Sequence, residues 1–225
     1  MTEDLKRQVA EAAAAQVEDG MVVGLGTGST AALMIDALGR RVAGGLRIVG
    51  IPTSERSARQ AAALGIPLVD FATHPEIDLT IDGADEVHTG TLELIKGLGG
   101  ALLREKIVAS ASRRMTVIVD GSKLVPRLGG VRLPVEVVGF GWQATALRLR
   151  QCGADPLLRG GEEAPFHTDG GNLILDCAFP AIDDAAALNA MLKSITGVVE
   201  TGLFIGLATT IIAATADGLQ TLERQ

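Results

Sequence analysis

The sequence is poor in aromatic residues. Phe, Trp and Tyr make up only 3% of its 225 residues, and tyrosine is absent. The hydrophobic fraction of 47% comes mainly from Ala, Val, Leu and Ile, which are small aliphatic residues that suit closely packed parallel sheets and helices. This composition excludes a disordered chain and predicts an ordinary globular core.

Positive charge is also scarce. The chain has 20 Lys and Arg against 27 Asp and Glu, which gives a formal net charge of −7, and it has no basic run. A nucleic-acid partner would need a positive surface, so this class of partner is disfavoured. An anionic ligand would need a local site of lysines and backbone N–H groups, because the overall field opposes it.

The sequence has few residues that could hold a metal or a disulfide. Cys152 and Cys177 are far apart and match no zinc or C-x-x-C spacing, so buried reduced thiols are expected, with a disulfide as the alternative. His74, His88 and His167 are scattered, which argues against a metal cluster. No segment reaches the ~20 apolar residues of a membrane span. The N-terminus is typical of a charged helix rather than a signal peptide, so we expect a cytoplasmic protein without a membrane partner.

Strand and helix patterns alternate in the first half of the chain. Strands are expected at 21–26, 46–51, 66–71, 77–83 and 115–121, and helices at 3–18, 29–41, 54–65 and 101–113. Apolar strands alternating with helices predict a parallel sheet covered on both faces.

The pattern changes after Gly129-Gly130. The following segments are expected: a strand at 133–138, a helix at 142–153, a hairpin over 155–179, a helix at 183–195 and a strand at 197–204. This β-α-β-β-α-β order is that of a ferredoxin-like unit. Residues 207–215 then return to the first sheet and a short helix follows.

The predicted fold class is therefore α/β. It comprises a Rossmann-like parallel-sheet domain of residues 1–130 plus 205–225, and a smaller inserted α+β, ferredoxin-like domain of residues 131–204.

Glycine is abundant, with 28 residues, and GLGTGST at 24–30 lies between a strand and a helix. Such glycines let the backbone approach a ligand, and N–H groups at a helix start favour phosphate. A tight turn with Ser29 as the helix cap explains the pattern equally well. The loop is neither a P-loop nor a dinucleotide fingerprint, because Ser29 replaces the third glycine. Ile51 and Pro52 stand where an acidic ribose-binding residue would be.

Two more polar loops follow apolar segments. DGADE at 82–86 places Asp82 and Asp85 beyond the carboxyl end of a strand, where parallel sheets bind ligands. These carboxylates can bind sugar hydroxyls or move protons, or they can form a turn that caps a helix. KGLGG at 96–100 places Lys96 before a glycine-rich loop and a helix start, which is a second anion-binding arrangement.

The next helix carries Glu105 on a face of small or apolar residues. These residues are Ala101, Val108, Ala109 and Ser112. Glu105 has no Lys or Arg four residues on to pair with, so it is a candidate base, against the common alternative of a solvated glutamate. Lys123 follows another strand in DGSK, either as a ligand group or as a solvated lysine.

In this order and spacing, GLGTGST, PTSER, DGADE, KGLGGALLREKIVAS, DGSK and LPVEV closely resemble the A-type ribose-5-phosphate isomerases. The resemblance extends over nearly the whole chain, including TDGGN and GVVETGLF. It implies interconversion of D-ribose 5-phosphate and D-ribulose 5-phosphate in the non-oxidative pentose phosphate pathway. It also implies a homodimer or homotetramer that needs no cofactor and no metal.

The resemblance also implies roles for individual residues. Glu105 matches the family's proton-accepting base, and Asp82, Asp85 and Lys96 are the other implied catalytic residues. The implied substrate-binding residues are Thr27, Gly28, Ser29, Thr30, Asp82, Gly83, Ala84, Asp85, Lys96, Gly97, Leu98, Gly99 and Lys123. Lys96 is the candidate cation for an enediolate, and either aspartate is a candidate for opening the sugar ring.

The sequence departs from the family at two positions. Thr209 and Ala214 stand where the family commonly has Asp and Gly. Neither position carries a candidate catalytic residue, so the departure concerns strand packing or assembly rather than the reaction.

Two other classes of protein fit parts of the pattern. A non-catalytic sugar-phosphate sensor would not need Glu105 and would normally carry a basic helix-turn-helix, which is not visible here. A nucleotide-dependent oxidoreductase would need the dinucleotide fingerprint that Ser29 interrupts.

Overall fold

The structure is a computed structural model that describes residues 3–224, and its contacts divide the chain into two compact units. Unit 1 comprises Met1–Ala84, Arg104–Leu124 and Gly206–Gln225, and unit 2 comprises Asp85–Leu103 and Val125–Ile205. The chain therefore passes between the units four times. The sequence-based boundaries at 131 and 204 stay a prediction of which segment forms an independent domain.

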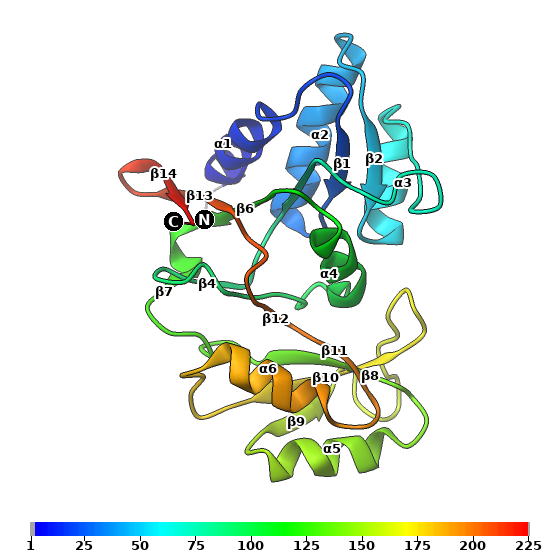
Figure 1. Cartoon of the computed structure of the whole chain (residues 1–225), viewed down its shortest axis with the longest axis vertical. Coiled ribbons are helices and arrows are strands. Elements are labelled where there is room, and N and C mark those ends of the chain that lie inside the picture. Colours follow the sequence, from blue (N-terminus) through cyan, green and yellow to red (C-terminus); the bar gives the residue numbers. More distant parts are fainter. Residues whose placement is uncertain (1–2, 225) are drawn as a thin grey trace. The chain divides into compact units, whose positions relative to one another are not determined.

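Unit 1 is built on a six-stranded sheet in the order β14-β13-β6-β3-β1-β2 (Figure 1). Its strands are β1 (Val22–Leu25), β2 (Val49–Pro52), β3 (Leu79–Asp82), β6 (Met115–Asp120), β13 (Thr210–Thr215) and β14 (Gly218–Glu223). All neighbouring strands are parallel except β13 and β14. The carboxyl ends of β1, β3 and β6 therefore lie at one edge of the sheet.

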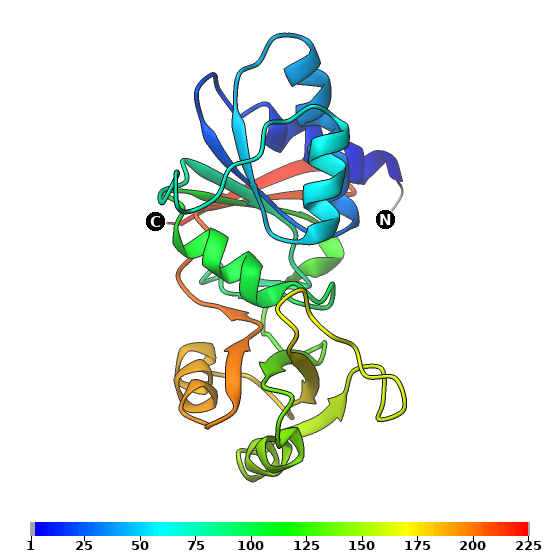
Figure 2. The same ribbon diagram turned by 90° about the vertical axis from the view of Figure 1, so that its right-hand side faces the viewer.

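Helices cover both faces of this sheet. They are α1 (Glu3–Ala14), α2 (Ser29–Ala43), α3 (Glu55–Ala63) and α4 (Leu102–Ser110), of which α4 belongs to unit 1 from Arg104 onward. Val23 and Leu25 of β1 pack into the core formed with α1 and α2, whereas Val22 packs in a separate cluster with Val108 of α4. Successive strand residues point to opposite faces, so α4 covers the face opposite α1, as Figure 2 shows.

The strand predicted at 66–71 is wrong. Only Leu68 forms a single parallel bridge, with Gly50. Pro67 has no N–H to donate to a sheet, and Asp70 then accepts hydrogen bonds from the amides of residues 72 and 73 in a turn. This segment is therefore an extended connection anchored by the buried side chain of Ile66.

The short terminal helix is also wrong, because residues 218–223 form β14. A turn ending at Gly218, with φ of 114°, pairs this segment with β13 in antiparallel register. As a strand, residues 218–223 pair their backbone N–H and C=O groups with those of β13. A helix there would leave the edge of β13 without these hydrogen bonds.

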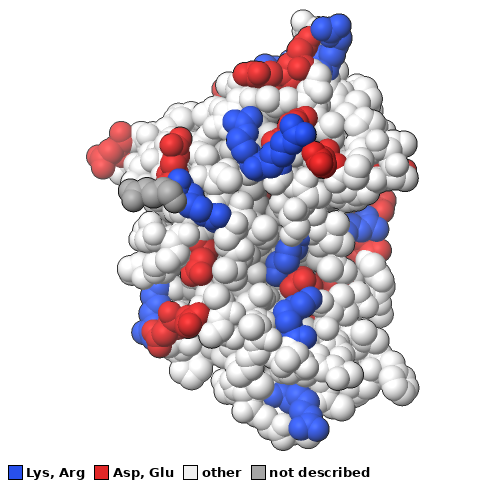
Figure 3. All heavy atoms as spheres, viewed as in Figure 1, with Lys and Arg blue, Asp and Glu red and all other residues white. Residues whose placement is uncertain are grey.

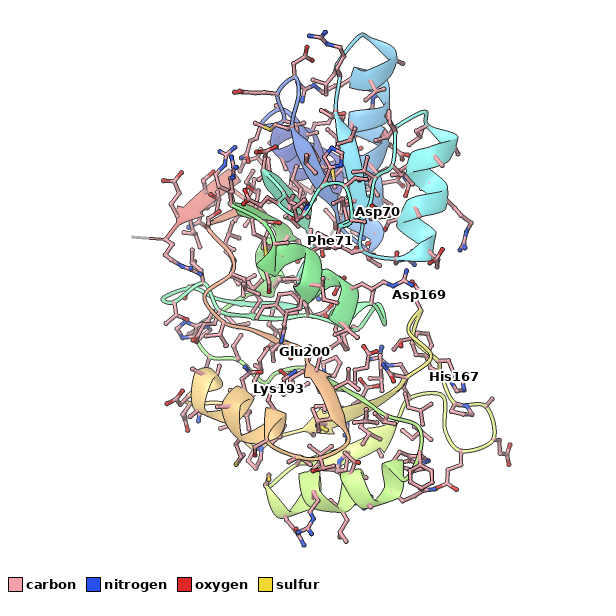
Figure 4. The ribbon with its side chains drawn as sticks, turned by 45° about the vertical axis from the view of Figure 1, so that its right-hand side comes forward. Asp70, Phe71, His167, Asp169, Lys193 and Glu200 are labelled. Carbon is pink, nitrogen blue, oxygen red and sulfur yellow. The ribbon has the colours of Figure 1, made fainter. Side chains whose placement is uncertain are left out.

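Unit 2 contains the predicted ferredoxin-like unit. Its elements are β8 (Leu133–Val137), α5 (Trp142–Gln151), β9 (Asp155–Leu158), β10 (Leu173–Ala178), α6 (Ala185–Lys193) and β11 (Val198–Thr201). The antiparallel order β11-β8-β10-β9 agrees with the prediction. Buried residues of β8 and both helices share one core. Lys193 of α6 donates to Glu200 of β11 over 2.8 Å (Figure 4).

A second sheet, in the order β12-β5-β4-β7, was not predicted, although β12 lies within the strand expected at 197–204. Its strands are β4 (Glu86–His88), β5 (Leu94–Ile95), β7 (Leu124–Val125) and β12 (Leu203–Phe204). Strands of two or three residues are too short to produce a recognisable alternation. Buried Glu86 fixes the nearby glycine turn by accepting from the amides of Gly129 and Val131, at 2.7 and 2.9 Å.

Surface and thiol features agree with the composition. Within residues 3–224, no helix is long and apolar enough to cross a membrane. The face in Figure 3 carries basic and acidic side chains interspersed.

Both cysteines are free thiols; Cys177 is buried, as predicted, whereas Cys152 is half-buried. Burial raises the pKa of Cys177 to about 12, so this thiol stays protonated at neutral pH.

Candidate active site

The loop between β1 and α2 ends in an uncapped helix start. Gly28 is the N-cap residue of α2, with φ of 129°, and it supplies no side-chain hydrogen bond to the first turn. Ser29 is the first residue of the helix, so the alternative in which Ser29 caps it is wrong. Backbone N–H groups at such a helix start form a natural site for an anion.

Asp82 ties this loop to the end of β3. Its Oδ1 accepts from the amide of Thr27 at 3.0 Å and from that of Gly83 at 2.7 Å. The carboxylate is fully buried. Gly26 lies directly against it, because a Cβ at Gly26 would stand 2.3 Å from Oδ1 and 2.6 Å from the Cα atom of Asp82. Only glycine fits this approach.

We expect Gly26→Ala to damage both stability and the loop. Asp82 cannot move without breaking its bonds to the two amides, so the methyl group overpacks the site at a cost of about 1–3 kcal/mol. Urea unfolding measures this loss. Gly139→Ala is the matched control, since its Cβ would lie 3.9 Å from the nearest atoms, those of Leu173. Equal stability of both variants with the wild type would contradict this account.

The side chain of Thr27 belongs to a buried hydroxyl cluster. Its Oγ1 lies 2.7 Å from that of Thr53, 2.8 Å from Ser54 Oγ and 3.1 Å from Ser57 Oγ. Ser57 donates in turn to the carbonyl of Gly26 at 2.7 Å. Because its hydroxyl is committed to the interior and its amide to Asp82, Thr27 can offer a ligand only its carbonyl.

The structure places Lys6, a residue that was not predicted for the site, beside the 27–30 loop. Lys6 of α1 donates from Nζ to Ser29 Oγ over 2.9 Å, and both residues line a surface hollow with Glu3 and Leu33. Lys6 thus places a positive charge beside the α2 N-terminus. Its sequence context, one charge among several on an amphipathic helix, gives no signal of this position.

Glu105 is buried in α4, with 3% of its surface exposed. A Cβ at Gly24 of β1, which pairs with Thr80 of β3, would lie 2.7 Å from Val108, whereas Ser112 after the helix forms a bridge with Ile77, which precedes β3. The helix therefore runs antiparallel to these strands. Glu105, one turn before Val108, lies nearer the carboxyl edge of the sheet.

Lys123 belongs to the same edge. It ends the short 3-10 helix η1 (Gly121–Lys123), which directly follows β6. Asp120 caps this turn by accepting from the amide of Ser122 at 3.0 Å. Unit 1 thus brings Asp82, Gly83, Ala84, Lys123 and the 27–30 loop to the carboxyl ends of neighbouring strands, with Glu105 on the covering helix.

Unit 2 holds the remaining predicted residues. Lys96 follows β5 and is buried, with 2% of its surface exposed, and its Nζ lies 5.4 Å from the centre of the Phe204 ring. Its amide donates to the carbonyl of Gly202 at 2.9 Å. The lysine is therefore held at both its backbone and its side chain.

The acidic loop and the lysine–glycine loop are in direct contact. Oδ2 of Asp85 accepts from the amide of Leu98 at 2.9 Å, and the amide of Asp85 donates to the carbonyl of Ile95 at 2.8 Å. Strand β4, not a helix, follows Asp85, so the alternative of a turn that caps a helix is wrong.

The chemistry available is that of carboxylates, lysines and backbone amides. Among residues 3–224, no group of three or more His, Cys, Asp or Glu side chains is arranged to hold a metal ion. Unit 1 supplies a buried glutamate, a buried aspartate and an anion-binding helix start, and unit 2 supplies a buried lysine with an aspartate nearby.

Comparison with known proteins is consistent across sequence and structure. The family model described as ribose 5-phosphate isomerase A (phosphoriboisomerase A) matches residues 49–218. A ribose-5-phosphate isomerase A of Gloeobacter violaceus is 58% identical, over 97% of this chain and 95% of the relative. The structure of ribose 5-phosphate isomerase A from Methanocaldococcus jannaschii matches with a TM-score of 0.95 and 42% identity over 100% of both chains. A D-ribose-5-phosphate isomerase in complex with phospho-erythronic acid matches equally, with a TM-score of 0.95, 40% identity and full coverage of both chains.

Proposed function

The chain belongs to the ribose 5-phosphate isomerase A family, and on this premise we propose how its own residues carry out the reaction. The chain is an aldose–ketose isomerase that converts ribose 5-phosphate to ribulose 5-phosphate, a step of the pentose phosphate pathway. The observation that carries the proposed mechanism is the buried carboxylate of Glu105, on the helix that covers the strand leading into the 27–30 loop.

The phosphate group binds at the N-terminus of α2. The uncapped amides of the first turn, the Ser29 and Thr30 hydroxyls and the Lys6 ammonium together supply donors and positive charge. A helix N-terminus favours a negative group by dipole and by direct hydrogen bonds. Lys123, which follows β6 at the same sheet edge, adds a second cation.

Removing the Ser29 hydroxyl should weaken binding rather than chemistry. The phosphate does not react, so Ser29 holds it equally in the ground and transition states, and Ser29→Ala should raise KM with kcat nearly unchanged. Steady-state kinetics on ribose 5-phosphate measures this split. Ser194→Ala, which removes a hydroxyl bonded only to the Met191 carbonyl of α6, is the control. A fall in kcat at constant KM would place Ser29 in the reacting part of the site.

Glu105 moves the proton. Its carboxylate takes the proton from C2 of the open-chain aldose, and the electron pair shifts through C1 to O1 to form an enediolate. Return of the proton to C1 and transfer of the O2 proton to O1 give the ketose. One buried carboxylate can serve both transfers because both carbons present the same face of a cis-enediolate.

Lys96 stabilises the enediolate. A buried ammonium acts on developing negative charge far more strongly than one in water. Asp82 and Asp85 are three residues apart, so the covalent chain alone keeps their Cα atoms within about 11 Å. We assign them to the sugar hydroxyls and to ring opening.

Activity should survive complete chelation of metals. The proposed steps use a carboxylate base and an ammonium group, so ribulose 5-phosphate should form from ribose 5-phosphate in EDTA without added cofactor. The increase in ketose absorbance measures it. Loss of activity in EDTA, restored by a divalent ion, would assign a metal to the acidic loop. Absence of turnover under every condition would remove the proposed function itself.

The family membership also supports a proposal for the cellular location and the oligomeric state of the enzyme. We propose a cytoplasmic homodimer or homotetramer that acts in the non-oxidative branch of the pathway. Sedimentation of the purified protein distinguishes the two assemblies from a monomer.

A further inference from the structure

The lysine–glycine loop forms neither a helix nor a strand, and its own backbone holds it through a turn in which the amide of Gly100 donates to the carbonyl of Gly97 at 3.0 Å. It leaves β5 at Lys96 and passes through Gly97 and Gly100, with φ of 109° and 82°. Such a segment has many accessible conformations, and fixing its backbone costs about 1–2 kcal/mol per residue. The turn bond leaves the Leu98 carbonyl unfixed, so contacts from outside the loop add to the selection of its conformation.

Arg159, just after β9, reaches this loop with its guanidinium. Its Nη1 donates to the carbonyl of Gly97 at 3.0 Å and to that of Leu98 at 3.2 Å. Asp176 of β10 holds the other side of the guanidinium, accepting from Nε at 2.9 Å and from Nη2. The ion pair is largely buried, with 15% and 19% of the two side chains exposed. A planar fork held in this way has a fixed direction.

The directions of the Gly97 and Leu98 carbonyls determine the directions of the Leu98 and Gly99 amides. A trans peptide unit is planar, so its C=O and N–H groups point in opposite directions. The Gly97 carbonyl is bound to Arg159, and the Leu98 N–H of the same unit donates to Asp85 over 2.9 Å. The Leu98 carbonyl is also bound to Arg159, so the Gly99 N–H points away from the guanidinium.

The connection between β9 and β10, residues 159–172, also contacts the guanidinium and the loop. Figure 4 labels His167 and Asp169 of this connection. The Phe166 ring lies 5.7 Å from the guanidinium carbon of Arg159. A Cβ at Gly100 would lie 2.4 Å from the same ring, so the aromatic ring closes one side of the loop.

We propose that Arg159, held by Asp176, is a positioning residue that directs the Gly99 amide of the lysine–glycine loop to the substrate and holds the Leu98 amide on Asp85. The inference rests on the proposed function, because the loop's use in catalysis is part of it. Arg159 itself does not touch the reacting atoms in this scheme; it acts through two peptide planes.

The experiment compares Arg159→Gln and Arg159→Lys with Arg132→Gln. Arg132 is a matched control because it also pairs with a carboxylate, Asp155, and donates to carbonyls of β9 and β10, without a bond to the loop. A misplacement of about 1 Å costs up to about 100-fold in rate, so both Arg159 variants should lose about 10- to 100-fold in kcat. Lysine should not rescue, because it lacks the planar fork.

Two further measurements separate positioning from general stability. Hydrogen exchange of the Leu98 and Gly99 amides should accelerate in the Arg159 variants but not in Arg132→Gln. Phospho-erythronic acid, a four-carbon acid that resembles an enediolate, should bind more weakly to the Arg159 variants, whereas inorganic phosphate should bind as to the wild type.

The outcomes are distinguishable. Wild-type kcat together with wild-type amide exchange in a folded Arg159→Gln or Arg159→Lys protein overturns the inference while the proposed function stands. A wild-type protein without isomerase activity removes the proposed function, and the exchange of the two amides then decides alone whether Arg159 positions them. Equal losses of kcat in Arg132→Gln and the Arg159 variants would reduce Arg159 to a structural residue.

Discussion

Glu105→Gln is expected to lower kcat by about 10²–10⁴-fold, the usual contribution of a positioned general base. Glutamine has nearly the shape of glutamate and still hydrogen-bonds, so the buried position in α4 remains filled and folding should change little. It cannot accept the C2 proton, however, so exchange of that proton with solvent should fall in parallel with turnover. Steady-state kinetics and exchange of the C2 position, followed on the same samples, test both effects.

Glu136→Gln is the control for this variant. Glu136 of β8 is as buried as Glu105, with 1% of its surface exposed, and its Oε1 accepts from Thr168 and Asn172 at 2.9 Å each. Glutamine keeps that acceptor, so this variant should retain wild-type turnover. A folded Glu105→Gln protein with near-normal turnover and exchange would exclude Glu105 as the base and leave Asp82 or Asp85 for the role.

Lys96→Met is expected to lower kcat by about 10²–10³-fold, as does removal of one group that stabilises a developing oxyanion. Methionine keeps the unbranched chain and can contact the Phe204 ring through its sulfur, so packing around β12 is preserved. The charge acts mainly on the enediolate, so KM should change less than kcat. Kinetics over a range of substrate concentrations separates the two.

Lys193→Met controls for loss of a lysine in the same unit. Lys193 pairs with Glu200 at the partly exposed end of α6, and a pair of this kind contributes only about 0–1 kcal/mol to stability. Its turnover should match that of the wild type. An increase in KM without a change in kcat in Lys96→Met would instead assign Lys96 to phosphate binding.

The parts of the fold that follow from local pattern could be predicted from the sequence. Long apolar strands and periodic helices identified the parallel sheet, and the β-α-β-β-α-β order identified the ferredoxin-like unit. The short strands β4, β5 and β7 could not be found, because each pairs through hydrogen bonds that depend on distant segments. The segment after Ile66 looked like a strand because apolar content alone does not show whether a partner strand lies beside it.

The same distinction applies to the candidate site. Loops at strand ends could be predicted, because parallel strands bring their carboxyl ends to one edge. The inward direction of the Thr27 hydroxyl could not, since it depends on three hydroxyls of the next strand end and helix. Lys6 and Arg159 carry no motif; their positions follow from helix and sheet packing. The structure gives Thr209 a place in the sheet, because its hydroxyl accepts from the amide and donates to the carbonyl of Met115 at the start of β6.

The order of strands in unit 1 has a consequence for how the chain is made. Strand β13 lies between β6 and β14, yet it is synthesised only after all of unit 2. Until then β6, a continuous apolar strand, has an open edge that can recruit a neighbouring nascent chain. Pairing with the hairpin of β13 and β14 then covers this edge of β6.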